Sequence, residues 1–218
     1  EEVSEASYAP RIGGADALLI RTQPMSATTI AAAERLRLVS RHGVGYDAVD
    51  VAGLNARGIA LAVCGDVNST SVAEHAMMLI LAATKRALKA DAAVRKGPWD
   101  WRQTLEAKDL AGRELLLVGY GRIGRHTARM AAGFDMRVSA FDPYLLAAGW
   151  PAGDVAPLAS LAEGLARADV VSLSVPRAER PLIGRPELAA MKDGVVIVNT
   201  SRGEVVDEDA LADAQASV

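Results

Sequence analysis

The chain has 218 residues, of which 50% are hydrophobic and only 4% aromatic, so it holds enough aliphatic material for one large buried core or two modest ones. A formal net charge of −3 argues against nucleic acid or an anionic membrane as the main partner. No apolar run approaches the ~20 residues of a membrane helix, no signal-peptide pattern opens the chain, and a single cysteine fits a reducing compartment, so we expect a cytoplasmic protein.

Strand-like and helix-like stretches alternate through the first part of the chain. Strands are expected at 17–20, 38–40 and 59–63, and helices at 27–36 and 50–57. Ser26 is a suitable N-cap for the first helix, and Gly58 is a suitable end for the second. This alternation indicates parallel strand–helix–strand units.

A longer helical pattern covers 69–95 and is broken by Gly97 and Pro98. An irregular stretch then runs to Gly112, where a new strand pattern begins. We therefore predict two domains, 1–96 and 97–218.

The second part of the chain has the clearer pattern. Strands are expected at 114–118, 136–141, 169–175 and 195–198, and helices at 122–132, at 161–167, around Pro186 and from Asp207. Ser160 and Glu163 form a capping-box pattern at the start of one of these helices. The alternation again indicates a parallel α/β sheet.

A GxGxxG sequence lies between a predicted strand and a predicted helix. Gly119 permits a tight turn, Gly121 lets a pyrophosphate approach the backbone, and Gly124 lets helix and strand pack closely. The helix N-terminus offers unpaired N–H groups and the positive end of its dipole to phosphates. Because the spacing and the context agree, we favour a dinucleotide site over a plain tight turn.

An acid at the end of the second strand is the feature that supports this interpretation, and Asp142 follows Phe141 about 20 residues after the glycine loop. Its carboxylate can accept hydrogen bonds from the adenosine ribose and repel a 2′-phosphate, so the predicted cofactor is NAD rather than NADP. The alternative is a solvated loop aspartate.

Arg202 follows the strand predicted at 195–198, at the edge where α/β sheets bind ligands. By position alone, a ligand-binding role and a surface pair with Glu204 or Asp207 are equally supported. No pair or triad of Cys, His, Asp or Glu has metal-ligand spacing, so we expect no metal site.

Four ordered segments resemble the D-isomer-specific 2-hydroxyacid dehydrogenases. They are RHGVGYD at 41–47, NSTSVAEH at 68–75, GYGRIG at 119–124 together with Asp142, and VNTSRGEVVD at 198–207. The resemblance implies an α/β fold with two Rossmann-like domains, a parallel-sheet NAD-binding domain and a flavodoxin-like substrate (catalytic) domain. It also implies that both domains are incomplete in this chain.

The same resemblance implies a reversible reduction of a 2-keto acid to its D-2-hydroxy acid with NAD. Arg202 matches the catalytic arginine, whose guanidinium binds the carboxylate and carbonyl oxygen of the keto acid. The implied substrate-binding residues are Val44, Gly45 and Asn68. The implied cofactor-binding residues are Gly119, Gly121, Arg122, Ile123, Gly124, Asp142, Pro176, Thr200 and Ser201.

The family reaction also needs a histidine that protonates the carbonyl oxygen and a glutamate that raises its pKa. The resemblance places both downstream of the arginine motif, beyond Val218. We favour structural roles for the three histidines of this chain: His75 on the long helix, His42 in the substrate loop and His126 on the helix after the glycine loop.

Three alternatives stay open within this resemblance: phosphoglycerate dehydrogenase, a non-enzymatic NAD-binding regulator and, less favoured, formate dehydrogenase. Arg21 and Arg41, at two predicted strand ends, do not decide between them. Ser174, where relatives often have histidine, and Arg180-Pro181 affect the expected substrate preference rather than the fold. The helix from Ser69 is expected to form a homodimer surface.

Overall fold

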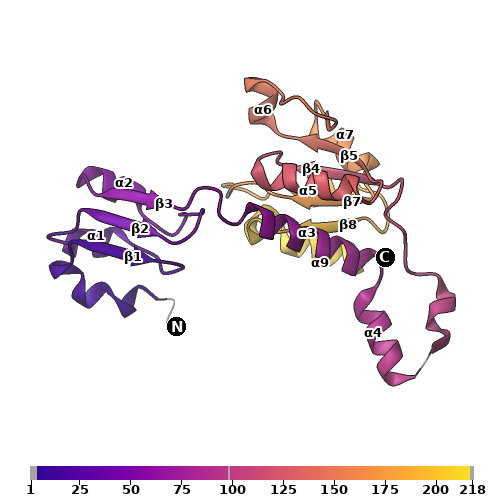
Figure 1. Cartoon of the computed structure of the whole chain (residues 1–218), viewed down its shortest axis with the longest axis horizontal. Helices are drawn as coiled ribbons and strands as arrows, with labels where there is room; N and C mark the ends of the chain where they lie inside the picture. Colours follow the sequence, from indigo (N-terminus) through magenta and orange to yellow (C-terminus); the bar gives the residue numbers. More distant parts are fainter. Residues whose placement is uncertain (1–3, 98, 217–218) are drawn as a thin grey trace. The chain divides into compact units, whose positions relative to one another are not determined.

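The computed structural model describes residues 4–97 and 99–216. Contacts between Cα atoms divide the chain into two compact units, Glu1–Val67 and Asn68–Val218. This division falls earlier than the boundary predicted near residue 96. The physical reason is that helix α3 (Ser69–Thr84) packs against α5 and β8 of the second unit. Figure 1 shows the helices and strands of both units.

The first unit contains a three-stranded parallel sheet of order β1-β2-β3. Its elements are β1 (Ala17–Ile20), α1 (Ala27–Ala32), β2 (Leu38–Arg41), α2 (Val51–Ala56) and β3 (Ala60–Val63), after two short 3-10 helices, η1 (Glu5–Ser7) and η2 (Ala9–Gly14). Ser26 caps α1 as predicted, and its side chain accepts a hydrogen bond from the Thr29 N–H. The helix ends earlier than predicted, and Arg57 donates to the carbonyl oxygens of Ile30 and Ala31 in its last turn.

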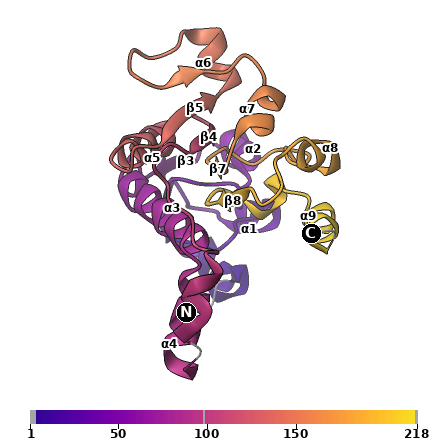
Figure 2. The ribbon, with the colours of Figure 1, turned by 90° about the vertical axis from the view of Figure 1, so that its right-hand side faces the viewer.

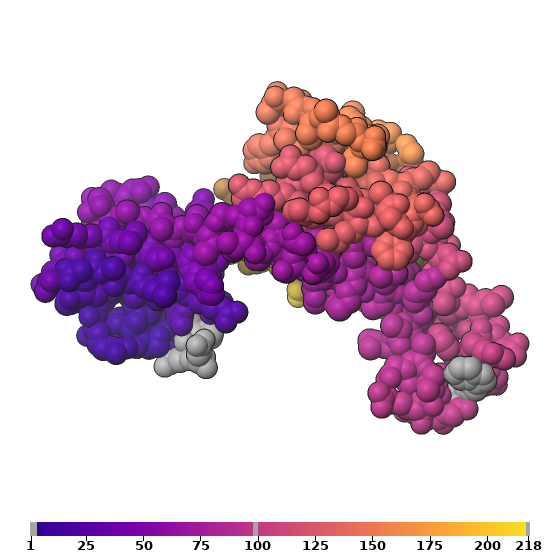
Figure 3. Space-filling view, in the orientation of Figure 1, coloured from indigo at the N-terminus to yellow at the C-terminus, as the bar shows by residue number. Residues whose placement is uncertain are grey.

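The single helix predicted at 69–95 is wrong: the structure has two helices, α3 and α4 (Ala87–Lys96), separated at Arg86. Arg86 adopts a left-handed conformation with φ of 53°, which interrupts the helical hydrogen bonding. Figures 1 and 3 show α4 protruding from the rest of its unit together with η3 (Trp99–Thr104). The predicted break at Gly97 is the C-cap of α4, whereas Pro98 lies outside the described residues.

The second unit is built on a five-stranded parallel sheet of order β6-β5-β4-β7-β8. Its strands are β4 (Glu114–Val118), β5 (Arg137–Phe141), β6 (Ala156–Pro157), β7 (Val170–Leu173) and β8 (Val196–Asn199). The order runs outward from β4 in both directions, so β4 and β7 flank the switch point at which α/β sheets bind ligands. The predicted parallel α/β fold is confirmed, although β6 was not predicted.

Helices cover both faces of this sheet. They are α5 (Arg122–Ala132), α6 (Pro143–Ala148), α7 (Leu161–Arg167), α8 (Arg185–Ala189) and α9 (Glu208–Ala216), with the 3-10 helix η4 (Gly203–Val205) before α9. Figure 2 shows α3 and α5 on one side of the strands and α7, α8 and α9 on the other. Alternate side chains of β4 point to opposite faces of the sheet and fill the cores on both sides. Leu115 and Leu117 pack in the core cluster that includes residues of α3 and α5. Leu116 and Val118 pack in the core cluster that includes residues of α7.

Asp169 joins three segments at the amino ends of the strands. Its carboxylate accepts hydrogen bonds from the Glu114 N–H at 2.9 Å and from Lys192 Nζ at 3.1 Å, and it lies 3.6 Å from Arg113. Burial by itself raises the pKa of Asp169, but the Glu114 N–H and the Lys192 and Arg113 cations hold that pKa below its ordinary value. The ionised carboxylate therefore stabilises the folded state.

Replacing Asp169 with asparagine is expected to lower the free energy of unfolding by about 1–2 kcal/mol at pH 7. A carboxyl group whose folded pKa is depressed stabilises above its unfolded pKa, here 3.8, and loses this effect as pH falls through the folded pKa. Urea unfolding at pH 7 and pH 3 tests this, because the difference between the two proteins should shrink at the lower pH. Asp91→Asn is the control, since Asp91 pairs with Arg95 on an exposed helix face. An equal effect of both substitutions would contradict the prediction.

Candidate cofactor and substrate site

The glycine loop between β4 and α5 has two glycines that the fold itself requires. Gly119 has φ of +91°, and a Cβ there would lie 2.4 Å from the Ser174 carbonyl oxygen. A Cβ on Gly124 would lie 2.4 Å from the Gly119 carbonyl oxygen, inside the contact between helix and turn. Both positions therefore exclude any side chain on packing grounds alone.

Gly121 differs, because a Cβ there would meet no described atom within 4 Å, and its φ of −71° suits any residue. The packing of the chain therefore does not explain this glycine. It lies at the N-cap of α5, where the N–H groups of the first turn have no acceptor within the helix. Open space beside the N–H groups of a helix N-terminus fits a pyrophosphate.

Asp142 lies beside this loop and is held by three backbone N–H groups. Its Oδ2 accepts from Tyr120 N at 2.9 Å, and its Oδ1 accepts from Tyr144 N and Leu145 N, each at 3.1 Å. Helix α6, which Asp142 caps, was not predicted, although Asp142-Pro143 is a typical start signal for a helix. A carboxylate has about four acceptor sites, so Asp142 keeps capacity for a ribose hydroxyl.

The loop after β8 is organised by Asn199. Its Nδ2 donates to the Arg202 carbonyl oxygen at 2.7 Å, and its Oδ1 accepts from Ser201 N at 2.9 Å and from Ser201 Oγ at 2.7 Å. Arg202 Nη1 donates to the Ser201 carbonyl oxygen at 2.9 Å. This role of Asn199 was not predicted, although an asparagine at the start of a tight loop is a signal for it.

The two acids that were alternative partners for Arg202 have other contacts. Glu204 lies 3.4 Å from the Arg177 guanidinium, and both side chains are exposed. Asp207 accepts a hydrogen bond from Ala210 N at 3.0 Å and so caps α9.

Pro176 and Thr200 follow β7 and β8, at the carboxyl edge of the five-stranded sheet. Pro176 follows β7 and is exposed. Thr200 N lies 3.4 Å from the Leu173 carbonyl oxygen, while its Oγ1 is buried without a hydrogen-bond partner among the residues that the structure describes. The carboxyl ends of β4, β5, β7 and β8 thus bring together the glycine loop, Asp142 and the 199–202 loop, as predicted for parallel strands.

The predicted substrate residues of the first unit lie at the carboxyl edge of its own sheet. His42 N donates to the Ile20 carbonyl oxygen at 2.8 Å, and Cys64 N donates to the Gly43 carbonyl oxygen at 3.1 Å, so the loop after β2 is held by its neighbours. Val44 in this loop is exposed. In the second unit, Asn68 is the exposed N-cap residue of α3.

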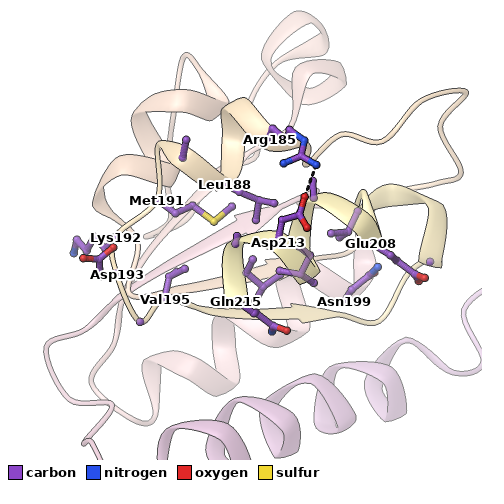
Figure 4. Close-up of a pocket in the computed structure, with 18 residues that line it drawn as sticks. Arg185, Leu188, Met191, Lys192, Asp193, Val195, Asn199, Glu208, Asp213 and Gln215 are labelled. Atoms are coloured by element: carbon purple, nitrogen blue, oxygen red, sulfur yellow. Dashed lines mark hydrogen bonds and ion pairs between the residues drawn. The ribbon is translucent and has the colours of Figure 1, made fainter. Parts of the chain in front are cut away.

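A cavity of about 960 Å³ lies elsewhere in the second unit, between α8 and α9 and alongside β8 (Figure 4). Its apolar lining includes Leu188, Met191 and Val195, and an ion pair between Arg185 and Asp213 links the two helices. None of the predicted site residues is among those that line it. We therefore do not assign the cofactor to this cavity.

Neither a membrane-spanning helix nor a metal-binding cluster occurs among the described residues. None of their helices combines the length and the apolar character needed to cross a membrane. They also contain no group of three or more His, Cys, Asp or Glu side chains that could hold a metal ion.

Comparison with known proteins gives two matches to family descriptions. Residues 77–217 match "D-isomer specific 2-hydroxyacid dehydrogenase, NAD binding domain", and residues 1–136 match the catalytic domain of the same family. The D-3-phosphoglycerate dehydrogenase of Mycobacterium tuberculosis is 42% identical over 92% of this chain and 38% of its own length. The hydroxypyruvate reductase of Thermotoga maritima is 36% identical over 90% of this chain and 63% of its own length.

Solved structures give the same result. The TT0316 protein of Thermus thermophilus superposes with a TM-score of 0.88 at 34% identity, covering 97% of this chain and 68% of that one. The D-lactate dehydrogenase of Aquifex aeolicus, solved with NAD and lactic acid, gives a TM-score of 0.87 at 28% identity, covering 98% and 65%. The chain thus spans less than two thirds of the length of the curated relatives named above. Two family matches that each cover more than half of the chain show that it belongs to the D-isomer specific 2-hydroxyacid dehydrogenase family.

Proposed function

We propose that the protein is an NAD-dependent oxidoreductase that interconverts a small 2-keto acid and its D-2-hydroxy acid. The observation that carries this proposal is the shared sheet edge in the second unit. There the open space at Gly121, the Asp142 carboxylate and the Arg202 loop occur together. The family match to an NAD-binding domain supports the cofactor.

The chain's own residues suit this reaction. The N–H groups of the first turn of α5, at Arg122, Ile123 and Gly124, would hold the pyrophosphate. Asp142 would hold the adenosine ribose and disfavour a 2′-phosphate. When bound, the reduced cofactor supplies a hydride for the carbonyl carbon of the keto acid.

Arg202 would bind the carboxylate and carbonyl oxygen of the keto acid, because a guanidinium stays charged and presents a planar fork of donors. Asn199 holds the backbone on both sides of that side chain. Pro176, Thr200 and Ser201 would line the nicotinamide.

The first unit would form the substrate domain. The backbone at Val44 and Gly45 would hold the substrate carboxylate, with Asn68 near the substrate. These roles rest on loops at the carboxyl ends of strands.

Reduced-cofactor consumption by the full-length protein tests the proposal. NADH and NADPH would each be offered with glyoxylate, hydroxypyruvate, pyruvate and phosphohydroxypyruvate. NADH-dependent turnover of one of these acids is expected. Binding of NADH without reduction of any of them would favour the non-enzymatic regulator instead.

A phosphorylated substrate is the second candidate. Arg21 follows β1 and Arg41 ends β2, on the same edge as Val44 and Gly45. The relative at 42% identity is named a D-3-phosphoglycerate dehydrogenase, which favours the same substrate class. A kcat/KM for phosphohydroxypyruvate well above that for hydroxypyruvate would support this candidate, and the reverse order would exclude it.

We also propose a homodimer, formed through an apolar patch on α3, α5 and the turn after α5 that consists of Met77, Met78, Leu81, Met130 and Phe134. Met78 and Phe134 are 49% and 43% exposed, although both are large and apolar. Met78→Glu is expected to raise the dimer Kd at least about 100-fold, because it buries a charge in the interface. Light scattering after size exclusion measures this, with Leu19→Glu, on the first unit, as the control. A monomeric wild type would contradict the proposal.

A further inference from the structure

Tyr120 connects the glycine loop to Asp142. It is the residue between Gly119 and Gly121, and its N–H donates to Asp142 Oδ2 at 2.9 Å. Its ring is buried, only 8% exposed, in the core cluster beneath α3 and α5. The orientation of the Gly119–Tyr120 peptide group therefore affects both the glycine turn and the Asp142 carboxylate.

The Tyr120 ring is stacked on Trp150. The two ring centroids are 5.1 Å apart and the ring planes differ by 5°. Trp150 is itself fixed, because its Nε1 donates to the Val155 carbonyl oxygen at 3.1 Å. The stack therefore joins the glycine loop to the segment between α6 and β6.

These contacts form a closed circuit. Asp142 Oδ1 holds the first N–H groups of α6, and Trp150 follows the end of that helix after Gly149. The stack leads from Trp150 to Tyr120, and the hydrogen bond leads from Tyr120 back to Asp142. Both carboxylate oxygens thus belong to the same circuit of contacts as the stack.

We propose that Trp150 is a positioning residue for the dinucleotide, because its stack on Tyr120 holds the Asp142 carboxylate in the orientation that binds the adenosine ribose and repels a 2′-phosphate. This inference rests on the proposed NAD-dependent function. If the stack is lost, the Tyr120 N–H and the Asp142 side chain gain conformational freedom, so the hydrogen bond between Asp142 and the ribose weakens. The repulsion of a 2′-phosphate weakens as well, because the charge can move away.

Equilibrium binding of NADH and NADPH to the full-length protein tests this, with no turnover required. Trp150→Ala is expected to raise the NADH Kd about tenfold, as the loss of an aromatic pair allows. The NADPH Kd should change much less, so the preference for NADH shrinks. Trp150→Phe keeps a stacking ring and should retain most of that preference. Asp142→Asn, which keeps a capping side chain without the charge, is the positive control for lost discrimination.

Val196→Ala is the matched control, because Val196 packs on the same core cluster from β8, two strands away from β4. A general loosening of the domain would raise the Kd values of NADH and NADPH equally. Val196→Ala should show at most this equal rise. Should Trp150→Ala fail to fold, Trp150→Leu keeps an apolar side chain without the stack and serves the same comparison.

The outcomes separate the two proposals. A wild type that binds neither cofactor would overturn the proposed function. A wild type that prefers NADH, with a Trp150→Ala variant that keeps the same NADH to NADPH ratio, would overturn the role of Trp150 alone.

Discussion

Replacing Arg202 with alanine is expected to reduce kcat about 10³-fold while leaving the NADH Kd nearly unchanged. The reason is that the guanidinium would act on the keto acid, where charge develops on the carbonyl oxygen during hydride transfer, and loss of one such donor has effects of this size. Steady-state kinetics with the best keto acid, combined with equilibrium binding of NADH, measures both quantities.

Two further variants sharpen this result. Arg202→Lys keeps the charge but not the planar fork, so partial activity is expected. Arg177→Ala removes a neighbouring guanidinium that pairs with Glu204 on the surface, and it should retain activity. If Arg202→Ala retained wild-type kcat, the catalytic assignment would be wrong.

Gly121→Ala is expected to raise the NADH Kd about 10- to 100-fold without lowering stability, because the new methyl group meets no described atom within 4 Å but occupies the approach of the pyrophosphate. Gly119→Ala is expected to lower the free energy of unfolding by about 2–4 kcal/mol. At that position the same methyl group would lie 2.4 Å from the Ser174 carbonyl oxygen.

Urea unfolding and NADH binding, measured for both variants, check this contrast. Each substitution adds one methyl group to the same loop, so each variant controls for the other. Equal loss of stability in the two would mean that Gly121, like Gly119, serves the fold rather than a ligand.

The sequence predicted the parallel α/β fold because its signals are local. Apolar runs of strand length alternate with helical spacing, and capping residues such as Ser26 and Ser160 mark helix starts correctly. The glycine loop and Asp142 were likewise recognisable, because their spacing follows from the length of one strand–helix–strand unit. Family membership followed from motifs of the same kind and is confirmed by the comparisons.

Features that depend on contacts between distant segments were not predictable in this way. The break at Arg86 divides a continuous helical pattern, because the apolar face of α3 packs on α5 and β8 while α4 protrudes with η3. The short strand β6 has only two residues and exists by pairing with β5.

The sequence by itself thus determined the type and order of most elements and the identity of the chemical groups. Only the tertiary structure decided which of these groups are fixed in position, and which contacts with other residues fix them. The stack of Tyr120 on Trp150 joins residues 30 positions apart in sequence, and no local spacing rule relates them. Similarly, the motif predicted a turn role for Gly119 and a ligand role for Gly121, but only the tertiary structure shows that the Ser174 carbonyl oxygen excludes a side chain at Gly119 while the space at Gly121 is open.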